Sequence, residues 1–90
     1  MGRYESKARH HFERIQYYHE NAGPRGYRQA LYHYDELGRL QMAAHNSKRN
    51  QSDASIIGIF REQAGHLMAE MKKRQEEWGQ QEKLKRDEPK

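Results

Sequence analysis

Apolar residues recur at intervals of three and four along three segments of the chain, and no segment alternates apolar and polar residues as a β-strand does. In the first segment these residues are Tyr4, Ala8, Ile15 and Tyr18, with His11 at the position between Ala8 and Ile15. In the second they are Tyr27, Ala30, Tyr34, Leu37 and Ala44, and in the third Ile56, Phe60, Ala64, Leu67, Met71 and Trp78, with Arg74 at one position of the same row. This periodicity predicts amphipathic helices and an all-α fold.

Two polar breaks separate the three segments. NAGPRG, at residues 21–26, contains a proline that cannot continue the helix before it. NSKRNQSD, at residues 46–53, lacks an apolar anchor, and we expect Ser52 or Asp53 to cap the helix that follows. The sequence therefore predicts one small domain over residues 1–83, with a long third helix and a flexible, frayed charged tail over 84–90. The predicted helices are at about 3–21, 26–46 and 53–83.

Few large aliphatic side chains are available to fill a core. The 90 residues include no valine, and only 33% of them are hydrophobic. Burying one leucine or isoleucine contributes about 1.5–3 kcal/mol, whereas ordering one residue costs about 1–2 kcal/mol. We therefore expect a thin core that the aromatic side chains, or a partner, must help to close.

The chain has no cysteine and no apolar run long enough to span a bilayer. Disulfides and thiolate metal sites are therefore excluded. These features favour a cytoplasmic (intracellular) location without membrane contact, and no cleaved signal peptide is expected after Met1.

Positive charge is concentrated in the first part of the chain. Residues 1–52 contain nine basic and five acidic residues, whereas residues 53–90 contain eight of each. All six tyrosines fall within the first 34 residues. This distribution favours an anionic partner for the N-terminal part, either nucleic acid or an acidic protein surface.

A cationic row lies one residue behind the apolar stripe of the first helix, about 100° round its axis. The candidate nucleic-acid-binding residues are this row, its extension on the second helix and the basic residues of the two breaks. They are Arg3, Lys7, His10, Arg14, Tyr17, Arg25, Arg28, Tyr32, Arg39, Lys48 and Arg49. The basic side chains would neutralise phosphates, and Tyr17 and Tyr32 would stack on exposed bases. The alternative is that this face is only solvated.

The stretch RHHFERIQYYHE, at residues 9–20, also raises the possibility of a metal or catalytic site. No two histidines of the chain lie three or four residues apart, so no helical ligand pair forms, and we expect no metal or other cofactor. His10 with Glu13, or His33 with Glu36, could form an oriented base. However, no nucleophile elbow or phosphate-cradling glycine loop accompanies them, so we do not expect an enzyme.

The third segment supports a rival hypothesis. It has more apolar groups than two shorter helices need, which suggests a regulator, inhibitor or assembly factor that docks through this helix, or a homo-oligomer formed by it. The candidate protein-interface residues are Ile56, Phe60, Leu67, Met68, Met71 and Trp78.

The histidines of the opening stretch predict a pH dependence. Histidine ordinarily gains a proton near pH 6.5. If His10, His11 and His19 lie on a phosphate-binding face, its affinity should rise as the pH falls from about 8 to 6.

Overall fold

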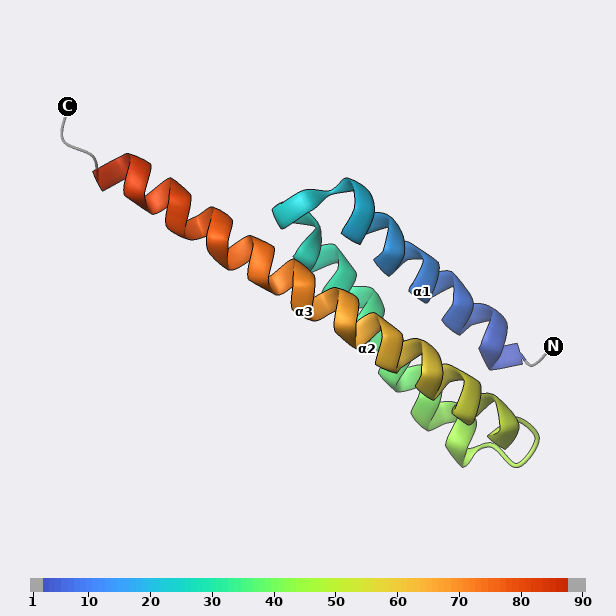
Figure 1. The fold of residues 1–90 in the computed structure, drawn as a ribbon. Coiled ribbons are helices and arrows are strands. Elements are labelled where there is room, and N and C mark those ends of the chain that lie inside the picture. The colour runs from blue at the N-terminus through green and yellow to red at the C-terminus, as the bar shows by residue number, and fades with distance from the viewer. Residues whose placement is uncertain (1–2, 88–90) are drawn as a thin grey trace.

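The chain folds into three helices joined by one short turn and one loop, which confirms the predicted all-α class. The computed structural model describes the backbone of residues 3–87 and, within it, the side chains of all residues except 23–24 and 81–87. The elements in chain order are α1 (Arg3–Asn21), the 3-10 turn η1 (Gly23–Gly26), α2 (Tyr27–Asn46) and α3 (Gln51–Asp87) (Figure 1).

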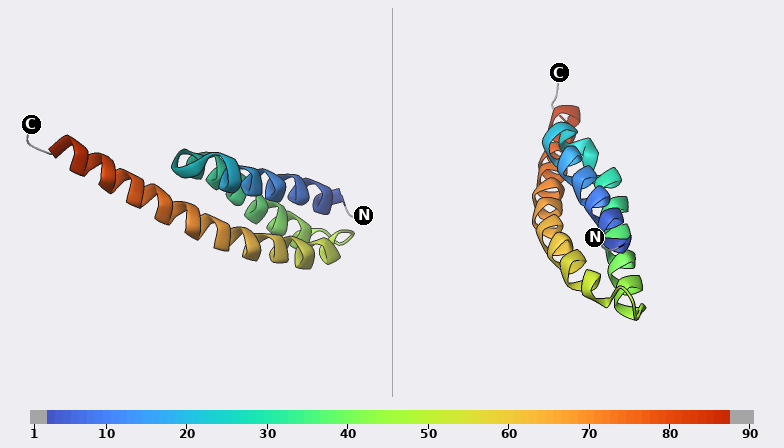
Figure 2. Two further views of the ribbon diagram at one scale, coloured as in Figure 1. Left: turned by 45° about the horizontal axis from the view of Figure 1, so that its top comes forward. Right: turned by 90° about the vertical axis from the view of Figure 1, so that its right-hand side faces the viewer.

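The helices form an elongated bundle whose principal extents are 64 × 20 × 15 Å. Each helix packs against both others, and Figure 2 shows α1 and α2 lying together along one part of α3. α3 has 37 residues, and at 1.5 Å per residue it is about 55 Å long, nearly twice the length of α1 or α2. Its C-terminal part therefore extends past η1, as Figure 1 shows.

The core is thin and repeats every seven residues. The core residues of α1 are Ala8 and Ile15, those of α2 are Ala30, Leu37 and Ala44, and those of α3 are Ile57, Ala64, Met68 and Met71. The large, fully buried side chains are Ile15, Leu37, Ile57 and Met71. The alanines let the helices approach closely, so few large side chains are enough to fill the space between them.

Aromatic side chains close the edges of this core, as expected from the shortage of aliphatic residues. Phe12 of α1 stacks on Phe60 of α3, with 5.3 Å between ring centroids. Tyr4, Tyr18, Tyr27 and Tyr34 are partly buried against the core.

The first polar break forms the tight turn that reverses the chain between α1 and α2. The Ala22 amide donates a hydrogen bond to the Tyr18 carbonyl at 3.1 Å, and η1 follows directly. Gly26 is buried there, and a Cβ at this position would lie 2.7 Å from the Cβ of Ala22. Glycine therefore permits a close approach that any larger residue would prevent. α2 begins at Tyr27, one residue after the predicted start.

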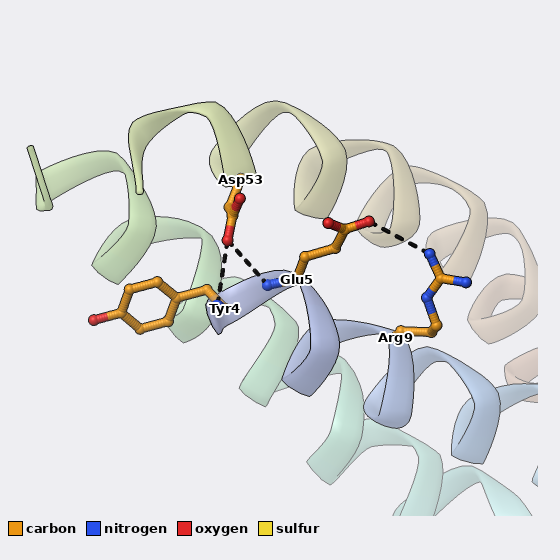
Figure 3. A network of polar contacts seen from close by, with 4 residues as sticks. All are labelled: Tyr4, Glu5, Arg9 and Asp53. Carbon is orange, nitrogen blue, oxygen red and sulfur yellow. Dashed lines mark hydrogen bonds and ion pairs between the residues drawn. The ribbon is translucent and has the colours of Figure 1, made fainter. Parts of the chain in front are cut away.

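The second polar break is shorter than predicted, and Asp53 caps a different helix from the one expected. α3 begins at Gln51, two residues before the predicted start, so the expected capping of this helix by Ser52 or Asp53 is wrong. The Asp53 carboxylate instead accepts hydrogen bonds from the amides of Tyr4 and Glu5, both at 3.2 Å (Figure 3). Asp53 thus caps α1, a helix that begins 50 residues earlier in the chain.

The end of α3 also differs from the prediction. The helix continues to Asp87, four residues past the predicted end at 83. Residues 84–87 of the predicted tail are therefore helical, and its last three residues, 88–90, lie outside the described part of the chain.

Candidate nucleic-acid interface

Two rings of α1 lie on the side of the helix that faces α2. His11 and Tyr18 both lie against His33 of α2, with ring centroids 5.1 and 6.0 Å from it. Arg14 lies about one turn from both rings, and Lys7 lies one turn before His11, so these basic residues follow the same edge of α1. The complete row, at spacings of three and four, is Arg3, Lys7, His10, Arg14 and Tyr17.

α2 adds a second row beside the first. The Tyr32 ring lies 6.4 Å from that of His11, which places it at the seam with α1. Arg28 lies one turn before Tyr32 on α2, and Arg39 lies two turns after it. We call the surface formed by both rows the α1–α2 face. Its residues are Arg3, Lys7, His10, Arg14, Tyr17, Arg28, Tyr32 and Arg39.

Most cations of the α1–α2 face have no carboxylate partner. Among the described residues, no carboxylate lies within ion-pair distance of Lys7, Arg14 or Arg28. Arg39 differs, because its guanidinium lies 3.1 Å from the carboxylate of Glu36. That pairing also turns Glu36 toward Arg39, although the sequence suggested Glu36 as the partner of His33.

Two tyrosines of the face are open to solvent, and one arginine is held between rings. Tyr17 is 50% exposed and Tyr32 is 59% exposed. The Arg14 guanidinium donates a hydrogen bond to the Tyr18 hydroxyl at 3.0 Å and lies 5.0 Å above the rings of both Tyr17 and Tyr18. These contacts fix the direction of Arg14 and leave its other N–H groups able to donate to an anion.

Six aromatic rings form a continuous array across the seam of α1 and α2. Tyr17 meets Tyr18, Tyr18 stacks on His33, and His33 contacts Tyr32 and His11, with centroids 5.0–6.0 Å apart. The sixth ring, that of His10, lies 5.5 Å from His11 and 6.5 Å from His33. The array places exposed rings and half-buried rings side by side on the α1–α2 face.

The centre of the array is a hydrogen bond between two histidines. Nδ1 of His11 and Nδ1 of His33 are 2.8 Å apart. One ring must donate and the other must accept, so the pair holds a single proton between these two nitrogens. Burial, followed by neighbouring positive charge from His10, lowers the pKa of His11 below its ordinary 6.5. Burial also lowers the pKa of His33, and the charges of His11 and Arg14 lower it further.

These lowered pKa values predict that the fold loses stability in mild acid. In the unfolded chain both histidines gain protons near pH 6.5, whereas the folded chain takes them up only at lower pH. The unfolded state therefore binds more protons, and the free energy of unfolding decreases as the pH falls from about 7.5 through the lowered pKa values. Thermal unfolding followed by circular dichroism at pH 7.5, 6.5 and 5.5, at constant ionic strength, measures this decrease.

A matched pair of variants assigns the effect. His33→Asn keeps a polar side chain of similar helix propensity but does not titrate, so its melting temperature should depend less on pH. His45→Asn, at an exposed position near the end of α2, should keep the wild-type dependence. An equal pH response in the wild type and His33→Asn would contradict the assignment.

Other residues predicted to bind nucleic acid lie apart from the α1–α2 face. Arg25, in η1, has its guanidinium 5.7 Å above the Trp78 ring, which directs it toward α3. Lys48 and Arg49 are exposed in the loop between α2 and α3. That loop lies at the end of the bundle where α1 begins, because Asp53 near it contacts the first turn of α1.

His19 does not lie with His10 and His11. Its Nε2 is 2.6 Å from a carboxylate oxygen of Glu70 on α3, and this hydrogen bond lowers the pKa of the Glu70 carboxyl. The expectation that His19 adds charge to the phosphate-binding face is therefore wrong. His11 is half-buried under its neighbours, and His10 is the exposed histidine of the three.

Four of the six candidate interface residues of α3 belong to the core or pack against it, namely Phe60, Leu67, Met68 and Met71. Met68 and Met71 are core residues, at 6% and 0% exposure, so their assignment to a docking surface is corrected. The Phe60 ring stacks on that of Phe12, and Trp78 is half-buried, with the Arg25 guanidinium 5.7 Å from its ring centre. The remaining two candidates, Ile56 and Leu67, are half-buried.

Sequence reasoning missed His33 and Tyr18 as members of the array. Tyr18 belongs to the apolar stripe of the first segment, and His33 lies beside the stripe of the second, four residues before Leu37. A signal was present, because His11 and His33 each lie four residues before a core residue. Two polar rings flanking the core of adjacent helices suggest a cross-helix pair.

Two other features bear on function. Across residues 3–87, no helix has both the length and the apolar character needed to cross a membrane. Among the residues whose side chains the structure describes, no group of three or more histidine, aspartate or glutamate side chains is placed to hold a metal ion. No protein-family model, curated protein or solved structure matches this chain.

Proposed function

We propose that this chain is a non-enzymatic helical protein that binds nucleic acid, alone or within a nucleic-acid-handling complex, through the α1–α2 face. The observation that carries the proposal is the juxtaposition on one face of cations without carboxylate partners and two tyrosines that are 50% and 59% exposed. Singly exposed apolar side chains are normal, but Tyr17 and Tyr32 are joined through Tyr18 and His33 into one continuous array, and continuous exposed patches are typical of interaction sites.

Each part of the face has a distinct role in this proposal. Lys7 and Arg28 are exposed and contact phosphates as mobile charges, while Arg14, held by Tyr18, donates in a fixed direction. Tyr17 and Tyr32 stack on unpaired bases, which every base permits because every base has a π face. The expected ligand is a flexible single strand bound without strong sequence preference. The bases of a duplex are already stacked on each other and cannot reach the rings.

Fluorescence anisotropy with a labelled 12-nucleotide single strand, at several salt concentrations from 50 to 200 mM, tests the proposal. Affinity should fall with salt, because binding releases counterions from the strand. The double variant Lys7→Gln with Arg28→Gln should bind more weakly and should reduce the salt slope by about 0.7 for each phosphate that is no longer neutralised. Absence of binding by the wild type at 50 mM salt would refute the proposal.

A charge-matched variant separates site-specific binding from a general effect of net charge. Lys72→Gln with Lys73→Gln removes the same charge from exposed positions on α3, where neither the array nor the basic rows lie. Its affinity and salt slope should remain close to those of the wild type. An equal decrease in affinity in the two double variants would show that net charge, and not the α1–α2 face, governs the interaction.

A further inference from the structure

We propose that His11 and His33 form a proton-linked phosphate subsite at the centre of the α1–α2 face, which takes up a proton when a phosphate oxygen enters between the two rings. This inference rests on the proposed function, because the phosphate is that of the bound strand. It adds a specific anion site and makes binding respond to pH.

The geometry of the pair restricts its proton content. With the two Nδ1 atoms 2.8 Å apart, one carries a proton and the other accepts it. If both Nδ1 atoms carried protons, two N–H groups would point at each other, so the rings must separate or receive an acceptor between them. The accepting ring already carries a proton on Nε2, so a proton taken from solution at its Nδ1 makes that ring an imidazolium. A phosphate oxygen is a suitable acceptor, because it can receive a hydrogen bond from each ring at once.

The surroundings of the pair favour an anion. From α1, His10 and the Arg14 guanidinium add positive charge, and Arg14 is held in place by Tyr18. From α2, Glu36 acts in the opposite sense, but its carboxylate lies 3.1 Å from Arg39. α3 contributes no charged group that acts on the pair among the described residues.

The subsite is within reach of a ligand. Both rings of the pair are half-buried, with the exposed side chains of His10 and Tyr32 beside them. A strand stacked on Tyr32 would therefore bring its backbone past the edge of the pair. The ordinary cost of charging the second ring is offset when the phosphate supplies the opposite charge.

Proton uptake has two consequences of opposite sign. Binding of the strand should strengthen as the pH falls toward 6, by at most about tenfold per pH unit for one linked proton. The free protein becomes less stable over the same range, because burial lowers the pKa of both rings and the folded chain takes up protons less readily than the unfolded chain.

Isothermal titration calorimetry measures the linked proton directly. A 12-nucleotide oligouridylate is titrated into the protein at pH 6.8 and 50 mM salt, in phosphate-free buffers that differ in ionisation enthalpy, with EDTA present. The observed binding enthalpy should depend linearly on the ionisation enthalpy of the buffer. The slope gives the number of protons taken up, which should be up to about one per strand. His11→Asn and His33→Asn should each lose most of this slope while still binding, and His45→Asn should keep it.

The outcomes separate this inference from the function on which it rests. Binding of the wild type without proton uptake would overturn the subsite and leave the nucleic-acid proposal intact. Absence of binding would overturn both. If an asparagine variant unfolds, proton NMR of the wild-type histidine rings decides, since the titration midpoints of His11 and His33 should move to higher pH when the oligouridylate is bound. Midpoints that do not move would overturn the inference.

Discussion

Replacing Met71 by alanine is expected to lower the free energy of unfolding by about 2–4 kcal/mol, the usual cost of removing a large buried side chain. Met71 has no exposed surface and is one of four large, fully buried side chains of the bundle. A thin core cannot easily collapse around the cavity, because half of its other positions are occupied by alanines such as Ala64. Chemical denaturation followed by circular dichroism measures the decrease.

The same variant decides between internal packing and docking by α3. If the seam of α3 joins two copies of the chain, Met71→Ala should lower the sedimentation coefficient, because the dimer dissociates, and should leave the stability of the monomer nearly unchanged. Internal packing predicts the reverse, an unchanged oligomeric state and a less stable fold. Met42→Ala is the matched control, since Met42 is 68% exposed and its replacement should alter the free energy of unfolding by less than about 0.5 kcal/mol. Equal destabilisation by the two variants would contradict the core assignment.

The helices could be predicted from the sequence because each depends on local spacing and local breaks. The stripe of the second segment contains Ala30, Leu37 and Ala44, and all three are buried in α2. In the third segment the stripe was displaced, because it omitted Ile57 and Met68, which are core residues. Periodicity shows that a helix has an apolar side but does not fix the centre of that side when apolar residues occur at adjacent positions.

The candidate site could be predicted only in part, for a related reason. The rows of the α1–α2 face follow from spacing within one helix, so Lys7 and Arg14 could be assigned to a common edge. Which side chains meet across helices depends on how α1 and α2 are rotated and shifted against each other, and no local pattern encodes this. The contact of His11 with His33, 22 residues apart, and the pairing of His19 with Glu70, 51 residues apart, are of this kind.

Asp53 of α3 is a buried polar residue that holds the first turn of α1. It is only 4% exposed, and its carboxylate accepts hydrogen bonds from two amides of the first turn of α1. These amides have no partner within their own helix, and Gly2, which precedes the helix, has no side chain to cap them. A negative charge is also favourable there, because it opposes the positive end of the helix dipole. One side chain of α3 therefore replaces the cap that the local sequence lacks.

Asp53→Ala should accordingly lower the free energy of unfolding by about 1.5–3 kcal/mol, the range found for hydrogen bonds to charged groups. Asp53→Asn should have a smaller effect, because the amide oxygen still accepts a hydrogen bond while the charge is removed. Asp35→Ala is the control for removing an exposed aspartate, with an expected change within about 0.5 kcal/mol.

In Asp53→Ala, amide hydrogen exchange should become faster at Tyr4 and Glu5, with a smaller increase at the core positions of α2. Equal stabilities of Asp53→Ala and Asp35→Ala would mean that α1 is positioned by its apolar contacts alone. If Asp53→Ala is less stable than Asp53→Asn, and both are less stable than Asp35→Ala, Asp53 holds the end of α1 that carries Arg3 and Lys7. It thereby fixes one end of the α1–α2 face.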